Sequence, residues 1–445
     1  MKNRSFFASP AGLLSAVLIA ALLLSGCAKP GGTENENGPS SALADSSAEE
    51  QLHVVPAQTA ERDPEARIEY TYTLNEKREA VITGCETEEK EIVLPGIIDG
   101  YPVREIGDRA FSGCGSIEKL TVPEGIRKIG LCAFERCAGL VSVTLPESLE
   151  QMADAVFYYC TSLKEITLPA SITDVPDYLC YHCEALEKVS FAEDTEKIGH
   201  YAFGHCAIAE IDFGEKTAEI GDYCFEGCPV KKAVFPQTLK KLGKWAFFDC
   251  GSLEEVLFPD GVEKIGDGAF YNCASLRSLV VPENAESPIS YLCNGCIALE
   301  EISFPYVGPK ENSPVIEVFS EWFGENITDK LMPVSVRKIE LTGEAGKLPE
   351  HYFYECDNIT DIVIKAPVRE IGRECFIGCA SMETVTLPEV LEKIGDDVFA
   401  ECPSLKKIVF GGSAEGWESF LNANAEALES PGNSAFLSAE IVFEK

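Results

Sequence analysis

A repeat of 23 residues, occasionally 22, runs through most of the chain and decides what the chain can fold into. The clearest copies carry an I-G-x-x-A-F segment and then a cysteine, as in residues 106–114, 129–137 and 265–273. An apolar residue typically follows the cysteine at the third position, two more follow at alternate positions, and a proline usually comes next. Self-similarity at a fixed period of this length is typical of a solenoid, in which each repeat contacts only its neighbours.

The two halves of the repeat predict different local structures. The L-x-x-I-x-L half alternates like a short strand, and proline ends it because proline cannot donate to a ladder. The I-G-x-x-A-F half is expected to turn a corner, where glycine relieves a tight backbone and phenylalanine fills the centre. We therefore predict an α/β-type solenoid with little helix, a right-handed superhelix of about 13 repeats with a parallel β-sheet on its concave face.

The consensus C-x-x-L-x-x-I-x-L-P-x-x-h-x-x-I-G-x-x-A-F-x-x-C (h, apolar) resembles the BspA-type, or treponemal, leucine-rich repeat, over about residues 66 to 445. Both ends resemble the caps of that family, the first as a hairpin. The segments concerned are 80–84, 92–95 and 99–103 near the start, and 411–412, Trp417 and 439–443 near the end. The resemblance implies a leucine-rich-repeat superhelix and attachment to host matrix proteins or to other bacteria.

The first residues are typical of an export signal. Lys2 and Arg4 precede an apolar core at 13–24, and the chain then reads Leu-Ser-Gly-Cys up to Cys27. A positive start, a short apolar core and small residues before a cleavage site mark a secretory signal. This Leu-Ser-Gly-Cys segment resembles the bacterial lipobox, which implies lipidation of Cys27 and anchoring through its acyl chains. A plain signal peptide with a chance cysteine is the alternative.

These patterns divide the chain into four segments. Residues 1–26 are predicted to be a lipoprotein signal peptide, and 27–65 a flexible acylated tether too polar to fold. Residues 66–410 are the repeat solenoid, with an N-terminal cap at 66–105, and residues 411–445 are the C-terminal cap. The period breaks at an insertion, 306–332, which contains Trp322 and Phe323. These aromatic side chains either carry recognition on a protruding loop or fold inward as a local core.

The charge excludes several classes of partner. The formal net charge is −36, and loss of Lys2 and Arg4 with the signal peptide takes it to −38. Nucleic-acid recognition begins with a basic surface, so neither DNA nor RNA is expected to bind. Anionic lipid is equally disfavoured, and we expect contact with a membrane only through the lipid anchor.

Cysteines and histidines are the candidates for chemistry. Twelve cysteines recur with the period of the fold, which indicates a packing position, and Cys180 and Cys293 stand where phenylalanine is expected. His182 and His205 lie one period apart and should stack, with His200 near, as a weak candidate for a transition-metal site. The alternative is a turn position occupied by histidine by chance. No metal or other cofactor is predicted. The cysteine column comprises Cys114, Cys137, Cys160, Cys183, Cys206, Cys228, Cys250, Cys273, Cys296, Cys356, Cys379 and Cys402.

A candidate binding surface lies in the outward column of the strands. The early positions of this column, Thr121, Thr144 and Thr167, carry hydroxyl groups. The middle positions are aliphatic and should form an exposed strip, which tends to mark an interaction site. The alternative is that these aliphatic residues only favour strand formation. The strip consists of Val234, Leu257 and Val280, beside Lys232, Glu255 and Ser278.

The sequence therefore predicts a cell-surface binding or adhesion module for a protein or glycan ligand on a bacterial lipoprotein, without catalysis. No nucleophile elbow, metalloprotease motif, phosphate loop or dinucleotide fingerprint is present. A structural or accessory envelope lipoprotein that assists polymer capture is the second hypothesis. A hydrolase with an unrecognised site is the third.

Overall fold

The computed structural model describes residues 68–286, 289–306, 335–354 and 356–444, all of which belong to one compact unit, Val54–Lys445. The predicted signal peptide, Cys27, the tether and most of the insertion, with Trp322 and Phe323, lie outside these residues. The described part forms a parallel β-solenoid of about 13 turns of about 23 residues, which confirms the predicted fold class. Among the described residues, no helix is long and apolar enough to cross a lipid bilayer.

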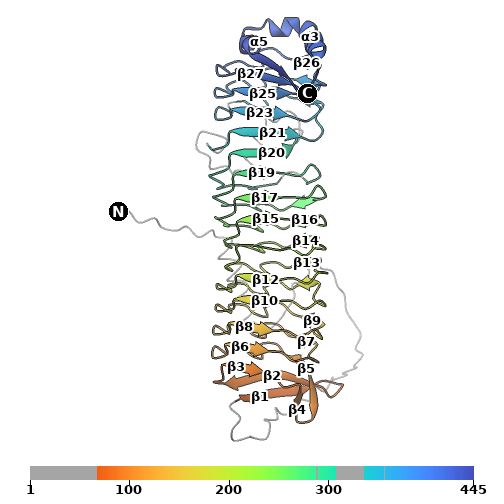
Figure 1. Cartoon of the computed structure of the whole chain (residues 1–445), viewed down its shortest axis with the longest axis vertical. Coiled ribbons are helices and arrows are strands. Elements are labelled where there is room, and N and C mark those ends of the chain that lie inside the picture. Colours follow the sequence, from red (N-terminus) through yellow and green to blue (C-terminus); the bar gives the residue numbers. More distant parts are fainter. Residues whose placement is uncertain (1–67, 287–288, 307–334, 355, 445) are drawn as a thin grey trace, which may run out of the picture. The chain divides into compact units, whose positions relative to one another are not determined.

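A row of strands in three hydrogen-bonded sections, β3 to β12, β15 to β17 and β19 to β28, is built from the L-x-x-I-x-L segments, as the alternation predicts, and is here called the front sheet (Figure 1). Neighbouring strands pair in parallel, residue by residue, as in Ile166 opposite Val189. The central residue of most of these strands is buried and its neighbours are exposed, because successive side chains point to opposite faces. The front sheet comprises β3 (Glu91–Val93), β6 (Lys119–Thr121), β8 (Ser142–Thr144), β10 (Glu165–Thr167), β12 (Lys188–Ser190), β15 (Lys232–Val234), β17 (Glu255–Leu257), β19 (Ser278–Val280), β20 (Glu301–Pro305), β21 (Lys338–Thr342), β23 (Asp361–Ile364), β25 (Thr384–Leu387), β27 (Lys407–Phe410) and β28 (Glu440–Phe443).

A second parallel ladder, here called the side sheet, begins each I-G segment and was not foreseen. Most of its strands are two residues long, so they carry no alternation that a sequence could show. Glycine then allows close approach of the coils: a Cβ on Gly266 would stand 2.3 Å from the backbone nitrogen of Lys244. The side sheet comprises β5 (Tyr101–Ile106), β7 (Lys128–Ile129), β9 (Gln151–Met152), β11 (Asp174–Val175), β13 (Lys197–Ile198), β14 (Glu219–Ile220), β16 (Lys241–Leu242), β18 (Lys264–Ile265), β22 (Lys347–Leu348), β24 (Glu370–Ile371) and β26 (Lys393–Ile394).

The corner that follows the side sheet is also hydrogen-bonded from coil to coil. Phe111 donates its backbone N–H to the carbonyl oxygen of Ala133 at 2.8 Å, and Phe134 donates to Val156 at 2.9 Å. All of these corner bonds run from one coil to the next one along the chain. Except where the front sheet is interrupted, the backbone of a coil is therefore hydrogen-bonded to its neighbours along the front sheet, the side sheet and the corner, as buried amides require.

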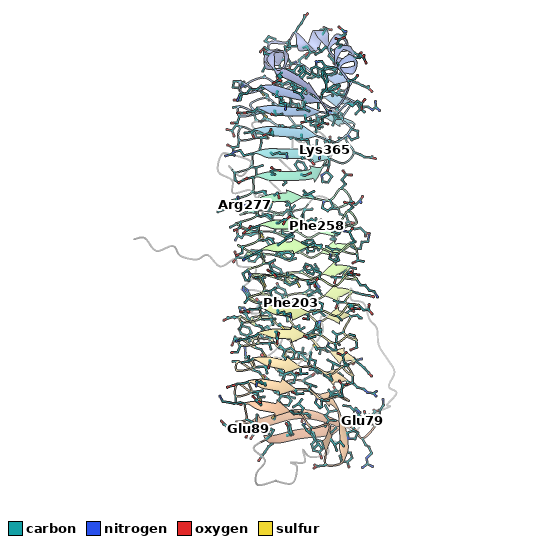
Figure 2. All side chains as sticks on the ribbon, viewed as in Figure 1. Glu79, Glu89, Phe203, Phe258, Arg277 and Lys365 are labelled. Carbon is teal, nitrogen blue, oxygen red and sulfur yellow. The ribbon has the colours of Figure 1, made fainter. Side chains whose placement is uncertain are left out.

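Phenylalanine side chains form a ladder inside the solenoid. The rings of Phe111 and Phe134 lie 5.1 Å apart, and those of Phe225 and Phe247 lie 5.3 Å apart. Figure 2 shows Phe203, a fully buried member of this ladder, inside the coils, whereas Arg277 lies at their outer edge. Cys180 and Cys293 take the phenylalanine position in their coils and are both buried, as the sequence indicated.

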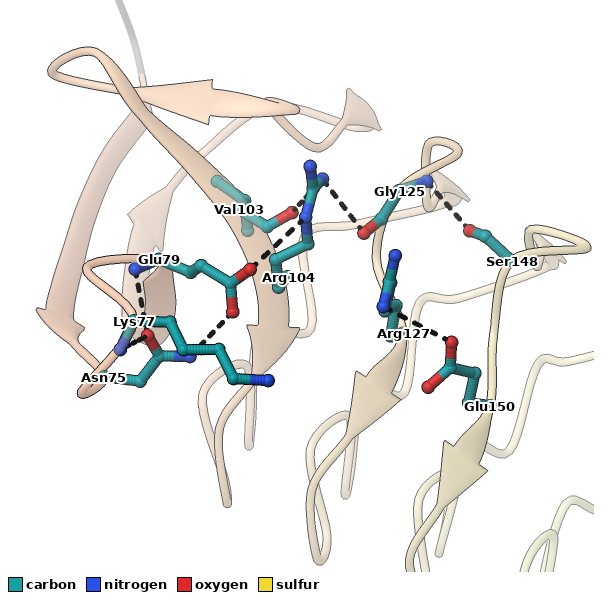
Figure 3. Close-up of polar contacts among 9 residues, drawn as sticks. All are labelled: Asn75, Lys77, Glu79, Val103, Arg104, Gly125, Arg127, Ser148 and Glu150. Carbon is teal, nitrogen blue, oxygen red and sulfur yellow. Dashed lines mark hydrogen bonds and ion pairs between the residues drawn. The ribbon is translucent and has the colours of Figure 1, made fainter.

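An antiparallel hairpin covers the first coil. It consists of β1 (Ile68–Leu74) and β2 (Ala80–Thr87), and β2 then pairs in parallel with β5, which also meets β4 (Ile97–Ile98). Arg104 links the hairpin to the coils: its guanidinium lies 3.9 Å from the carboxylate of Glu79 and donates to the carbonyl of Gly125 at 3.1 Å (Figure 3).

Short helices cover the last coil, whose corner N–H groups have no further coil to bind. Asp397 donates its backbone N–H to the Ser430 hydroxyl at 3.1 Å, and Phe399 donates to the Asn433 side chain at 3.3 Å. Asn424 accepts from the backbone of Ile394 in the same way. The elements are α3 (Ala414–Ala423), α4 (Ala425–Leu428), η1 (Pro431–Asn433) and α5 (Ser434–Ser438), before β28 completes the front sheet.

Candidate functional site

The aliphatic strip predicted from the sequence is present on the outer face of the front sheet. The side chains of Val234, Leu257 and Val280 are 49%, 43% and 58% exposed on three consecutive coils. Val234 pairs directly with Leu257 in the parallel register of β15 and β17. At the next position along the column, Ser303 is only 8% exposed, which ends the strip.

A polar column runs beside this strip. Lys232 and Glu255 are paired in register, and the ammonium of Lys232 lies 2.7 Å from a carboxylate oxygen of Glu255. Ser278 follows on β19 and is exposed. Both side chains of the ion pair are about half exposed, so the pair contributes little stability. Its position beside apolar side chains suits a rim that orients a bound partner.

The two histidines stack as their spacing predicts. The ring centroids of His182 and His205 are 4.3 Å apart at an interplanar angle of 17°, and Tyr159 stacks on the other face of His182 at 4.5 Å. Desolvation and the neighbouring His205 lower the pKa of His182. The rings therefore lie face to face, and their nitrogens do not converge on a common point.

The third histidine has a different role. His200 accepts the backbone N–H of Asp222 at its Nδ1, at a distance of 2.9 Å. Among the described residues, no group of three or more histidine, cysteine, aspartate or glutamate side chains could hold a metal ion. The stacked pair acts in this structure as a packing element of the corner.

A second stack of aromatic side chains lies near the histidines and was not foreseen. Tyr178, Tyr201 and Tyr223 stack at 4.8 and 4.7 Å on successive coils, and Trp245 follows at 6.1 Å. The indole of Trp245 also covers Gly268, where a Cβ would meet it at 2.3 Å. The rings cover one another's faces, so they offer their edges to any ligand.

The cysteine column is a packing position with one additional function. The thiol of Cys250 donates to the backbone carbonyl of Phe225 at 3.1 Å, and Cys183 bonds to Phe157 in the same way. Every cysteine in the described part of the chain is a free thiol. Burial raises the pKa of the Cys250 thiol well above its usual range, which makes the thiol unreactive.

Aspartates after the side sheet also bridge the coils, a role that sequence reasoning missed. The Asp177 carboxylate accepts the backbone N–H of His200 at 2.7 Å, and Asp222 accepts that of Lys244 at 2.8 Å. The recurrence of aspartate directly after the I-G pair, or after V-P at Asp177, is the sequence signal that could have revealed this role. These carboxylates are therefore structural groups and are not free for chemistry.

Family comparison identifies the repeat. The model of the BspA-type leucine-rich-repeat region matches residues 104–229, 218–311 and 332–438, which is more than half of the chain. The chain belongs to the BspA-type leucine-rich-repeat family. No curated protein shows significant similarity to it.

Several solved leucine-rich-repeat structures are similar to this member of the family. A Bacteroides ovatus protein is 21% identical, with 84% of this chain and 98% of that chain covered and a TM-score of 0.46. A cell-surface protein of Faecalibacterium prausnitzii is 21% identical, with coverage of 79% and 95% and a TM-score of 0.37. The T. pallidum leucine-rich-repeat protein is 27% identical, with coverage of 52% and 87% and a TM-score of 0.31.

Proposed function

We propose that this chain is an exported binding module that holds a partner protein on the front sheet and carries out no chemistry. The observation that supports the proposal is the exposed strip of Val234, Leu257 and Val280 on three consecutive coils. Contiguous exposed apolar surface is a feature of interaction sites. The Lys232–Glu255 pair and Ser278 give this strip a polar border that fixes the orientation of a partner.

Export and anchoring form part of the same proposal. The lipobox-like sequence at Cys27 supports a diacylglyceryl anchor, and residues 27–65 would hold the solenoid away from the membrane. Metabolic labelling with a fatty-acid analogue should label the wild-type chain and leave the Cys27→Ala variant unlabelled.

The strip is tested by replacing Val234, Leu257 and Val280 with lysine and measuring capture of host matrix glycoproteins by the purified chain. Loss of the three aliphatic contacts that a bound partner would bury should weaken binding by roughly 3 kcal/mol, about a hundredfold in Kd. The matched control replaces Thr121, Thr144 and Thr167 with lysine. These residues occupy the same column of the front sheet on earlier coils. Equal capture by both triple variants, with the fold retained, would show that the strip does not bind the partner.

An accessory role in the envelope is the second candidate. It is supported by the same strip, and it predicts capture of envelope polymers in place of host glycoproteins. The same pair of triple variants, probed with both kinds of material, separates the two.

A further inference from the structure

The front sheet is interrupted between β12 and the following coil, and again between β17 and β19, where the Arg277 N–H still bonds to the Glu254 carbonyl. The parallel ladder that begins at β3 ends at β12. The next coil is joined forward instead, through a bridge between Glu210 and Lys232 and a bond from the Lys231 N–H to the Ala209 carbonyl. In Figure 1 the arrows of the front sheet accordingly pass from β12 to β15.

The interruption leaves one edge of β12 unpaired. Lys188 donates to the carbonyl of Lys164, and Ser190 accepts from Leu168, so both residues bond backward to the β10 coil. In a parallel strand the intervening residues bond to the opposite side. Val189 and the N–H of Phe191 therefore face the following coil, where no backbone bond joins them to any described residue.

The side chains of this region are also less covered than most of their equivalents, although Val143 and Phe258 are partly exposed as well. Val189, Phe191 and Ile211 are partly exposed, and they pack against the core from outside it. The corresponding residues of the coils on either side, Ile166, Ala233, Val256 and Leu279, are buried.

The ring contacts and the cavity agree with this interruption. The ring centroids of Phe213 and Phe235 lie 5.4 Å apart in a tilted contact, but among the described residues no ring contact joins Phe191 to Phe213. A cavity of about 710 Å³ lies here, lined by residues 188–194 of one coil and 212–216 of the next.

The opening is local, because the same two coils are closed elsewhere. On the side sheet, Lys197 pairs with Glu219 in the regular register of β13 and β14. Beyond the strand, the ammonium of Lys216 lies 2.5 Å from the carboxylate of Asp194 and joins the coils at that end. The result is a cleft, here called the β12 cleft, with an apolar floor and a free strand edge.

The charge around the cleft is mostly negative. Two lysines, Lys188 and Lys216, lie among six exposed acidic residues, and Lys216 is already paired with Asp194. Unpaired strand edges are templates for another strand, and added strands take their affinity from backbone bonds and their specificity from alternate side chains. The acidic residues are Glu187, Glu193, Asp194, Glu210, Asp212 and Glu215.

We propose that the β12 cleft binds an extended basic segment of a partner protein, which adds to the free edge of β12 as a strand. The edge from Glu187 to Phe191 accommodates about five residues, or about 16 Å of extended chain. Alternate aliphatic side chains of the segment would cover Val189 and Phe191, and its basic side chains would meet the acidic rim. The β12 cleft adjoins the aliphatic strip, because Asp212 and Val234 occupy the same outward column on successive coils. The inference therefore rests on the proposed function and names the kind of partner.

The test uses the full chain and an acetylated, amidated peptide of alternating lysine and valine, seven residues long. Val189→Pro removes one N–H from the free edge without removing a bond to β10, whereas Val189→Thr keeps that N–H and serves as the matched control. We expect the peptide to bind the wild type and Val189→Thr equally, and to bind Val189→Pro at least tenfold more weakly. Hydrogen exchange of the wild type should slow at residues 187–191 when the peptide binds.

Several results would overturn the inference. They are absence of peptide binding, equal binding by Val189→Pro, protection outside residues 187–191, or protection of these residues by a neutral glycan and not by the peptide. The exchange measurement needs no variant, so it decides the question even if Val189→Pro fails to fold. If the lysine variants of the strip lose their partner while Val189→Pro keeps it, the proposed function stands and the β12 cleft does not bind that partner.

Discussion

Replacement of Cys250 by alanine tests why a thiol recurs once in each coil. The side chain is fully buried and its Sγ lies 3.1 Å from the carbonyl oxygen of Phe225. That oxygen also accepts the backbone N–H of Cys228, so the variant leaves no carbonyl without a partner. The cost is therefore the lost sulfur volume, about 1 kcal/mol with its cavity, and a net hydrogen bond of about 1 kcal/mol.

We expect Cys250→Ala to lower the free energy of unfolding by about 2 kcal/mol, and Cys250→Ser by about 1 kcal/mol, since serine keeps a donor. Urea unfolding followed by circular dichroism measures both, with an unchanged slope as the sign that the transition is comparable. Cys114→Ala is the matched control, because that half-buried thiol lies 3.7 Å from its acceptor and should matter less. A serine variant no more stable than the alanine variant would refute the role of the hydrogen bond.

Two further predictions concern the glycines and the histidines. Gly266→Ala places a Cβ against the Lys244 backbone and should lower the free energy of unfolding by about 3 kcal/mol. Gly251→Ala is the control and should lower it by almost nothing, because the space around Gly251 is open. Equal urea midpoints for the two variants would contradict the close approach of the coils. The pKa of His182 is lower in the folded chain than in the unfolded chain. As the pH falls below about 6.5, His182 is therefore protonated in the unfolded chain before it is protonated in the folded chain. The stability that neutral His182 provides is present above that pH and is lost below it. The urea midpoint should therefore fall between pH 7.5 and 5.5 more steeply in the wild type than in His182→Phe. Parallel pH profiles of the two proteins would show that His182 is not responsible.

Periodicity in the sequence predicted most of the fold because each coil repeats the same packing problem. The buried Cys180, the stacking of His182 on His205 and the exposure of Leu257 all follow from one register carried from coil to coil. The side sheet could not be predicted in this way, since a strand of two residues has no alternation. The aromatic stack was missed because the tyrosines occupy a position that other coils give to arginine or alanine, such as Arg109 and Ala155.

The β12 cleft shows where spacing alone is insufficient. In the coil after β12 the first apolar residue follows Cys206 by two positions, at Ile208, in place of the usual three. The next coil has the same shortening, from Cys228 to Val230, and yet β15 pairs normally with β17. Whether a shortened coil opens the sheet depends on how both neighbours accommodate it, which is a three-dimensional property.

The direction of the corner hydrogen bonds has a consequence for how such chains change in length. Each corner offers N–H groups to the coil that follows and carbonyl groups to the coil that precedes, as Phe111 and Phe134 do. At the corner, the internal boundaries of the described coils therefore present the same donors and acceptors, even where the front sheet is interrupted, whereas the side chains of Ser430 and Asn433 bind the N–H groups of the last coil only. Whole coils can be duplicated or deleted between the hairpin and the terminal helices without a new design for either end, so the reach of the molecule can vary between relatives while its terminal segments stay the same.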